Sequence, residues 1–115
     1  MFDDVSSAAL QVALTGLAQR QRVIANNIAN IETPGFRAGK VQFEAALDAA
    51  VASGRSPADV RPTVETSLEP TRLNGNNVNL DQETLSNVDT NLRYQLALRG
   101  LDSKYSMLRD VIKGS

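Results

Sequence analysis

The chain has 115 residues, a length typical of one domain, with 42% hydrophobic residues, only 4% aromatic residues and a formal net charge of −1. This near-neutral charge gives no electrostatic basis for binding nucleic acid or an anionic membrane. The sequence contains no Cys and no His, so the usual thiolate nucleophile, general base and transition-metal ligands are missing. We therefore expect no enzyme, no metal site, no cofactor and no small-molecule substrate.

Residues 1–32 are predicted to form a long N-terminal helix. Between Val5 and Ile31 the only charged residues are Arg20 and Arg22, whereas a solvent-facing helix side is normally charged. Apolar residues at alternating steps of three and four form a heptad seam: Leu10, Leu14, Leu17, Ile24, Ile28 and Ile31. The other side carries small or uncharged residues: Ala8, Val12, Thr15, Gln19, Val23, Asn26 and Asn30. We expect protein to enclose this helix on more than one side, and so short a chain should obtain that cover from other subunits.

The N-terminal sequence does not indicate a membrane anchor or a cleavable secretory signal. Polar residues interrupt the helix well short of the ~20 apolar residues that a membrane span needs. The first residues include the acidic pair Asp3 and Asp4, where a secretory signal would be basic.

A middle region, residues 33–80, is predicted to be mostly extended or irregular. The run Thr33-Pro34-Gly35-Phe36 fits a type II turn that ends the first helix, and Phe36 is either part of a simple helix stop or an anchor of the middle region. A short amphipathic helix is expected near 41–53, and residues 64–68 alternate like a short strand. We expect residues 55–79 to lack a compact fold.

Residues 81–115 are predicted to form the second long helix. Asp81 occupies the expected N-cap position, with Leu80 and Leu85 placed as a hydrophobic staple. Two apolar stripes lie on opposite sides of this helix: Leu85, Val88, Leu92 and Leu96 on one, and Tyr94, Leu98, Leu101, Tyr105, Leu108 and Ile112 on the other. Either the helix kinks near Gly100 or its two halves pack against different partners.

These elements predict an all-α fold in which the long N- and C-terminal helices pair as an antiparallel, coiled-coil-like hairpin, forming one assembly domain. A two-helix hairpin has a single internal seam, so the remaining apolar stripes require other subunits. The residues expected to form the assembly interface are Leu10, Leu14, Leu17, Ile24, Asn26, Asn27, Ile28, Asn30, Ile31, Leu85, Val88, Leu92, Leu96, Leu98, Leu101, Tyr105, Leu108 and Ile112.

Three asparagines near the end of the first helix allow two interpretations. Asn26, Asn27 and Asn30 cost roughly 2 kcal/mol together relative to Ala in a helix interior. They are either solvated residues at a fraying helix end, or they bond to neighbouring helices and fix the register between subunits, as a buried Asn does in coiled coils.

Residues 25–36, with the sequence Ala-Asn-Asn-Ile-Ala-Asn-Ile-Glu-Thr-Pro-Gly-Phe, closely resemble the N-terminal signature of the bacterial flagellar axial proteins. This family contains rod, hook and hook-associated proteins. Residues 74–81, 92–95 and 111–114 are similar to the corresponding parts of its proximal rod members, and residues 37–72 match only loosely.

This resemblance implies a structural subunit of the basal body rod, which serves as the axial drive shaft and channel needed for motility. It also implies export by the flagellar type III apparatus without a cleavable signal peptide, and assembly in the periplasmic space. The implied partners are other copies, other rod proteins and the membrane ring or rod-junction proteins. In related axial proteins the C-terminal helix lines the channel. The alternatives are another small rod protein and a cytoplasmic helical adaptor or export chaperone.

Overall fold

The computed structural model describes the backbone of residues 4–114 and the side chains of residues 5–107, 109 and 110. In chain order the elements are α1 (Asp4–Ala29), β1 (Gly39–Gln42), α2 (Glu44–Ala52), the short 3-10 helix η1 (Pro57–Asp59), β2 (Thr63–Thr66) and α3 (Leu80–Gly114). The molecule is elongated, measuring 66 × 26 × 14 Å. Among the described helices, none has the length and apolar character required to cross a membrane.

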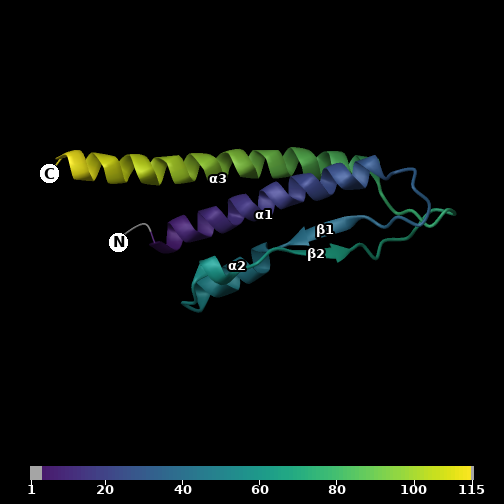
Figure 1. The fold of residues 1–115 in the computed structure, drawn as a ribbon, viewed down its shortest axis with the longest axis horizontal. Coiled ribbons are helices and arrows are strands. Elements are labelled where there is room, and N and C mark those ends of the chain that lie inside the picture. The colour runs from purple at the N-terminus through teal and green to yellow at the C-terminus, as the bar shows by residue number, and fades with distance from the viewer. Residues whose placement is uncertain (1–3, 115) are drawn as a thin grey trace.

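The two long helices lie side by side and antiparallel, as predicted, and the far end of α3 extends past the start of α1 (Figure 1). Side-chain hydrogen bonds set their register: Gln21 Nε2 donates to Asn91 Oδ1 at 2.6 Å, and Asn27 Nδ2 donates to Glu83 Oε1 at 2.8 Å. Helix α3 runs straight past Gly100 (Figure 1), so the expected alternative of a kink is wrong. Gly100 lies beside Leu10 of α1 with room for a side chain, because an added Cβ would be 3.5 Å from Leu10 Cδ2.

The middle region forms a β-hairpin whose strands pair antiparallel from Gly39↔Thr66 to Gln42↔Thr63. Helices α2 and η1 fill the connection between these strands, and the whole region packs mainly on α1 (Figure 1). The predicted all-α fold therefore describes the long helices correctly but misses this two-stranded sheet. The short helix is confirmed as α2, within the expected range 41–53, and the strand expected at residues 64–68 is present as β2. The expectation that residues 55–79 lack a compact fold is wrong where η1 packs on α1 and β2 pairs with β1.

A small apolar core joins the middle region to the helix pair. Its buried residues are Leu17, Val41 and Phe43, against which the partly buried residues Ala13, Val23, Leu47 and Tyr94 pack. The Phe43 ring lies directly over Gly16, because a Cβ built at Gly16 would be 2.5 Å from Phe43 Cδ1. Only glycine permits this close approach of the hairpin to α1.

The middle region also provides part of the cover that the sequence suggested must come from other subunits. On the side of α1 opposite its seam, Val12, Gln19 and Val23 are half-buried. A β1 residue, Gly39, lies so close to Val23 that an added Cβ would be 3.2 Å from Val23 Cγ1. The expectation of cover from other subunits is therefore wrong at these positions, whereas Thr15 remains exposed.

The start of α3 differs from the predicted start. The side chain of Asn79 caps this helix, because its Oδ1 accepts a hydrogen bond from the Gln82 backbone N–H at 3.1 Å. Asp81 lies inside the first turn and is not the cap. Leu80 and Leu85 are 50% and 71% exposed, so they do not form the expected hydrophobic staple.

Candidate assembly surface

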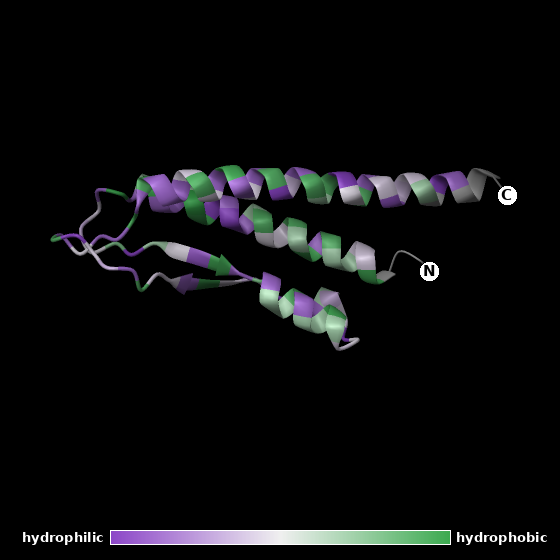
Figure 2. Cartoon of the chain, turned by 180° about the vertical axis from the view of Figure 1, so that it is seen from behind, coloured by the Kyte–Doolittle hydropathy of each residue, from purple (hydrophilic) through white to green (hydrophobic). Residues whose placement is uncertain are grey.

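Helix α3 carries a continuous exposed apolar row, which we call the α3 row. It consists of Leu85 (71% exposed), Val88 (62%), Leu92 (59%) and Leu96 (59%). Figure 2 shows hydrophobic colour recurring along α3. Four large apolar side chains facing solvent along one helix are typical of a surface that another protein covers.

The opposite face of α3 forms the seam with α1, and its buried residues are mostly small or polar. Thr90 is 1% exposed, Ala97 is 8% exposed and Glu83 is 7% exposed. These residues recur every seven positions, which is the heptad spacing, but they lack the large apolar side chains by which a seam is normally recognised. The predicted stripe that begins at Tyr94 lies on this same side of α3, and three of its members are half-buried: Tyr94, Leu98 and Leu101. The sequence therefore marked the face that contacts α1 only in the C-terminal half of α3.

The predicted seam of α1 lies largely within the chain. Leu17 and Ile24 are 3% and 5% exposed, and the other members of the seam are half-buried: Leu10, Leu14, Ile28 and Ile31.

In the C-terminal part of α3, Leu98 and Leu101 are half-buried and Tyr105 is 41% exposed. The predicted contacts of Leu108 and Ile112 lie outside the described side chains. A role in contacts between subunits therefore remains a prediction, both for these α3 residues and for the α1 seam.

The structure places the three asparagines of α1 in different environments. Asn27 is 1% exposed; it donates to Gly39 O at 3.0 Å and Glu83 Oε1 at 2.8 Å, and it accepts from Gly39 N at 2.9 Å. This side chain therefore joins α1, β1 and α3 of its own chain, and the solvated interpretation is wrong for it. Asn26 is exposed, and Asn30 donates to the Asn26 carbonyl of the preceding turn at 2.8 Å. A register role between subunits remains a prediction for this pair.

The loop end of the molecule is organised by a second buried amide, Asn76, which is 0% exposed. Its Nδ2 donates to Asn30 O at 2.8 Å and Thr33 O at 2.9 Å, so it satisfies two backbone carbonyls that follow α1. Its Oδ1 accepts from Val78 N at 2.8 Å and from the Arg72 guanidinium at 2.9 Å. Asn76 thus uses all four of its hydrogen-bonding positions.

The adjacent Asn77 holds the open end of the β-hairpin in the same way. Its Oδ1 accepts from Ala38 N at 2.7 Å, and its Nδ2 donates to Ser67 O at 3.2 Å and Glu69 O at 3.1 Å. Sequence reasoning assigned residues 74–77 only to a turn, because hydrogen bonds to residues far along the chain leave no local pattern. The clustering of Asn residues was the only available signal.

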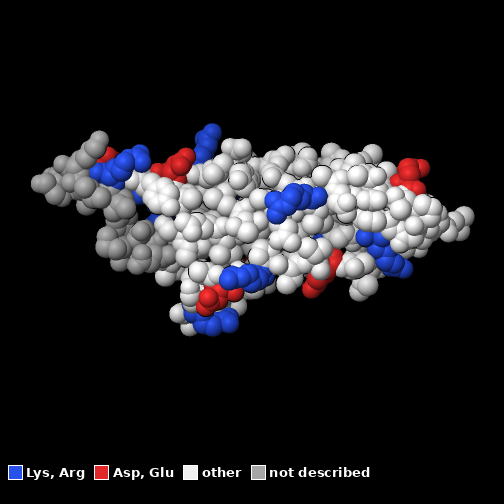
Figure 3. Space-filling view, in the orientation of Figure 1, with Lys and Arg blue, Asp and Glu red and all other residues white. Residues whose placement is uncertain are grey.

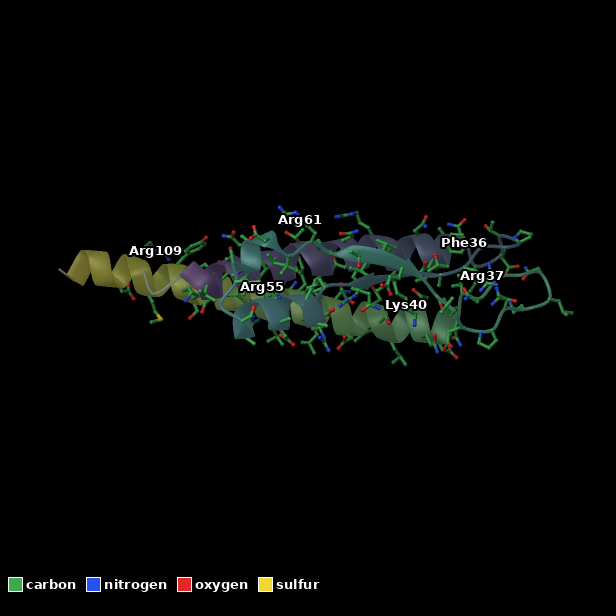
Figure 4. The ribbon with its side chains drawn as sticks, turned by 90° about the horizontal axis from the view of Figure 1, so that it is seen from below. Phe36, Arg37, Lys40, Arg55, Arg61 and Arg109 are labelled. Atoms are coloured by element: carbon green, nitrogen blue, oxygen red, sulfur yellow. The ribbon has the colours of Figure 1, made fainter. Side chains whose placement is uncertain are left out.

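The predicted turn at Thr33–Phe36 is present. Phe36 N donates to Thr33 O at 3.2 Å, and Gly35 has the positive φ of 76° that a type II turn requires. Gly35 N donates to Asn74 O at 2.8 Å, so the turn is fixed to the segment that precedes α3. Figure 4 places Phe36 and Arg37 at the loop end, far from Arg109. The Phe36 side chain is half-buried, and its role as an anchor remains a prediction.

One ion pair fastens the middle region to α1. Arg20 donates to both carboxylate oxygens of Glu44, with Nη2 2.7 Å from Oε1, and the same Nη2 donates to Val41 O at 2.7 Å. The guanidinium lies 5.1 Å from the centroid of the Phe43 ring, which is cation–π distance. The hydrogen bonds from Arg20 hold the pKa of the Glu44 carboxyl below its ordinary value, against the opposing effect of burial.

Charged side chains are sparse on the face of the molecule that Figure 3 shows, where broad white areas separate them. No group of three or more acidic residues within the described part of the chain could hold a metal ion. The described surface thus offers helix faces, above all the α3 row, for packing.

Comparisons with known proteins agree with this interpretation. The sequence profile described as "Flagella basal body rod protein" matches residues 9–37. The chain is 32% identical to the flagellar basal body rod protein FlgB of Escherichia coli (strain K12), over 90% of this chain and 89% of that protein. It is also 32% identical to FlgB of Bacillus subtilis (strain 168), over 91% of both chains, and 33% identical to FlgB of Borrelia hermsii, over 70% of this chain and 75% of that protein.

Proposed function

This chain belongs to the family of FlgB flagellar basal body rod proteins, and we propose that it builds the proximal part of the rod through packing of its helices against neighbouring subunits. It is a structural subunit of the basal body rod and not an enzyme. Family membership therefore argues against the alternative of a cytoplasmic adaptor or export chaperone. The proximal position within the rod is part of what we propose.

The observation that carries the packing proposal is the α3 row. Covering a large apolar side chain fully contributes about 1.5–3 kcal/mol relative to leaving it exposed, and the row offers four such side chains that are more than half exposed. A subunit that remained alone would keep this surface in water. Association with neighbouring copies or with other rod proteins covers it.

The proposed setting extends to the rest of the basal body. The two helices differ in charge, because α1 has only Arg20 and Arg22 between Val5 and Ala29 whereas α3 is charged throughout. This contrast supports placing the flanks of α3 towards a water-filled channel. We also propose that the chain is exported by the flagellar type III apparatus, assembles in the periplasmic space and contacts membrane ring or rod-junction proteins.

A pair of charge substitutions on α3 tests the proposal. In a strain that lacks this gene, the chain is supplied with either Leu92→Glu, within the α3 row, or Asn87→Glu, at an exposed polar position about 140° around the same helix from Leu92. Both variants add one negative charge and place a good helix former in α3, so they should reach similar protein levels.

We expect Leu92→Glu to leave membrane rings without a completed rod in electron micrographs of isolated basal bodies, in cells that do not swim. The Asn87→Glu variant should restore rods and swimming. Normal swimming with Leu92→Glu at equal protein level would show that the α3 row is not an assembly surface.

A further inference from the structure

The α3 row cannot be covered by the chain to which it belongs. At about 100° per residue, Val88 lies about 180° around the helix from Ala97, and Leu92 lies about 200° from Thr90. Ala97 and Thr90 are buried against α1, so the row points directly away from the helix pair. Its cover must come from another molecule.

Helix α1 has an uncovered face whose side chains complement the row. Thr15 and Arg22 are exposed and lie two turns apart, and Ala18 lies between them and is half-buried. Small side chains of this kind allow close approach of a second helix, whose larger side chains can pack between them. Apart from Arg22, the described residues of this face are uncharged.

Two charged residues without a partner extend this complementarity. Asp81 lies one turn before Leu85, in line with the row, and it is exposed. Within the described part of the chain, neither Asp81 nor Arg22 has a hydrogen-bond or ion-pair partner, whereas the other acid near the row, Asp89, binds Arg93 at 2.9 Å. One face thus offers an unpaired anion and the other an unpaired cation.

The spacing of the two faces matches when the helices run antiparallel. From Asp81 the row continues by steps of four, three and four to Leu92. From Arg22 the α1 face continues backwards by the same steps through Ala18 and Thr15 to Gln11. Setting Arg22 level with Asp81 therefore places Ala18 beside Leu85 and Thr15 beside Val88.

We propose that the α3 row of one copy packs antiparallel on the uncovered α1 face of a second copy, with Asp81 of the first paired to Arg22 of the second. This inference rests on the proposed function and names the partner of the same surface. The two contacting faces are different, so the contact is heterologous and every copy keeps one free row and one free α1 face for the next.

This register also displaces successive copies along the molecular axis. Within one chain Gln21 lies level with Asn91, which sets Arg22 level with Thr90. Between copies Arg22 lies level with Asp81, nine positions earlier, which corresponds to about 13–14 Å at ~1.5 Å per residue. A heterologous contact with an axial step does not close into a two-fold dimer; it continues as a helical array.

Disulfide crosslinking tests this arrangement directly, because the chain has no cysteine of its own. Two differently tagged full-length copies, one with Thr15→Cys and one with Val88→Cys, are expressed separately or together in a strain without the native gene. Isolated basal bodies are then oxidised. The control is a single chain with Gln21→Cys and Asn91→Cys, positions that are hydrogen-bonded within one chain and should close an intrachain bond.

We expect a dimer carrying both tags only in cells that express both variants, and a ladder of higher oligomers from one chain with both Thr15→Cys and Val88→Cys. A homodimer of the Val88→Cys variant alone would overturn the proposal, since it would show two rows facing each other. Closure of the control bond without any crosslink between positions 15 and 88 would also overturn it.

Charge reversal provides a second measurement that does not depend on disulfide geometry. We expect Arg22→Glu to impair swimming and the added change Asp81→Arg to restore it; no restoration would contradict the ion pair. If Leu92→Glu blocks the rod while these tests fail, the packing function stands and the proposed partner face is wrong. If Leu92→Glu has no effect, the packing function itself fails.

Discussion

Replacing Asn76 with Asp should test the buried network at the loop end most directly, because the two side chains have nearly the same shape. The change keeps the oxygen that accepts hydrogen bonds from Val78 N and Arg72. It converts the Nδ2 donor into a second carboxylate oxygen, which would then lie 2.8 and 2.9 Å from the carbonyl oxygens of Asn30 and Thr33.

The expected cost follows from these contacts. Two hydrogen bonds are lost at about 1 kcal/mol each, although both carbonyls keep a backbone donor, Thr33 N for Asn30 O and Phe36 N for Thr33 O. The new carboxylate oxygen is buried against these two carbonyl oxygens without a donor of its own, which adds roughly 1–3 kcal/mol. A stronger, charge-assisted bond to Arg72 returns about 1 kcal/mol of this. We therefore expect Asn76→Asp to lower the free energy of unfolding by roughly 2–4 kcal/mol, a large share of the 5–15 kcal/mol typical of a domain.

Urea unfolding of the purified chain, followed by far-ultraviolet circular dichroism, measures this loss. The matched control is Asn79→Asp, three residues away, where the side chain is exposed and caps α3 through an acceptor oxygen. Asp is as good an N-cap as Asn and its charge suits a helix N-terminus, so the control should stay within about 0.5 kcal/mol of the native chain. Equal effects of the two substitutions would refute the role assigned to the Asn76 amide.

Three further substitutions probe the packing of the middle region on α1 and the helix contact. Gly16→Ala places a Cβ 2.5 Å from Phe43, an overpacking cost of about 1–3 kcal/mol that should exceed the gain of ~1 kcal/mol in helix propensity and lower the urea midpoint. The Cβ of Gly100→Ala meets its nearest atom at an ordinary 3.5 Å, so this change should raise the free energy of unfolding by roughly 0.5–1 kcal/mol and raise the urea midpoint. Midpoint shifts of the Gly16 and Gly100 variants in the same direction would contradict this reasoning. Because Arg20 lowers the pKa of Glu44, their ion pair stabilises the fold above the unfolded-state pKa of this carboxyl, and the stabilisation disappears as the pH falls through the lower folded-state value. Since the Glu44 side chain is 40% exposed, Glu44→Gln should cost only about 0.5–1 kcal/mol at neutral pH, and this cost should shrink as the pH falls through the lowered folded-state pKa of the carboxyl; a cost that does not change with pH would count against the pair.

The features that the sequence predicted correctly have local causes. The heptad seam of α1 is visible because large apolar residues recur at helical spacing, and two of them, Leu17 and Ile24, are among the most buried residues. The turn at Thr33–Phe36 follows from the fixed φ of Pro34 and the freedom of Gly35. The short helix α2 is likewise explained by its own amphipathic pattern and by Gly54, which has a φ of 77° at its end.

The features that the sequence did not predict depend on residues far apart in the chain. In the N-terminal half of α3, Glu83 and Thr90 mark the face that contacts α1, yet these polar residues give no hydrophobic signal. Asn76 has the composition expected of a turn, and its burial depends on carbonyls more than 40 residues earlier. The β-hairpin is equally non-local, since residues 43–62 separate its two short strands.

The long separation between the paired helices has a consequence for the order in which the chain can fold. Residues 30–79 lie between α1 and α3, so their contact requires closure of a long loop, which slows folding relative to bundles with local contacts. Until the last third of the chain has been synthesised, the seam of α1 has only the middle region against which to pack. Incomplete chains that end before α3 would therefore display a long, nearly uncharged helix with an uncovered seam, and such exposed apolar surface promotes aggregation. Any stalled or truncated product should be much less soluble than the complete chain.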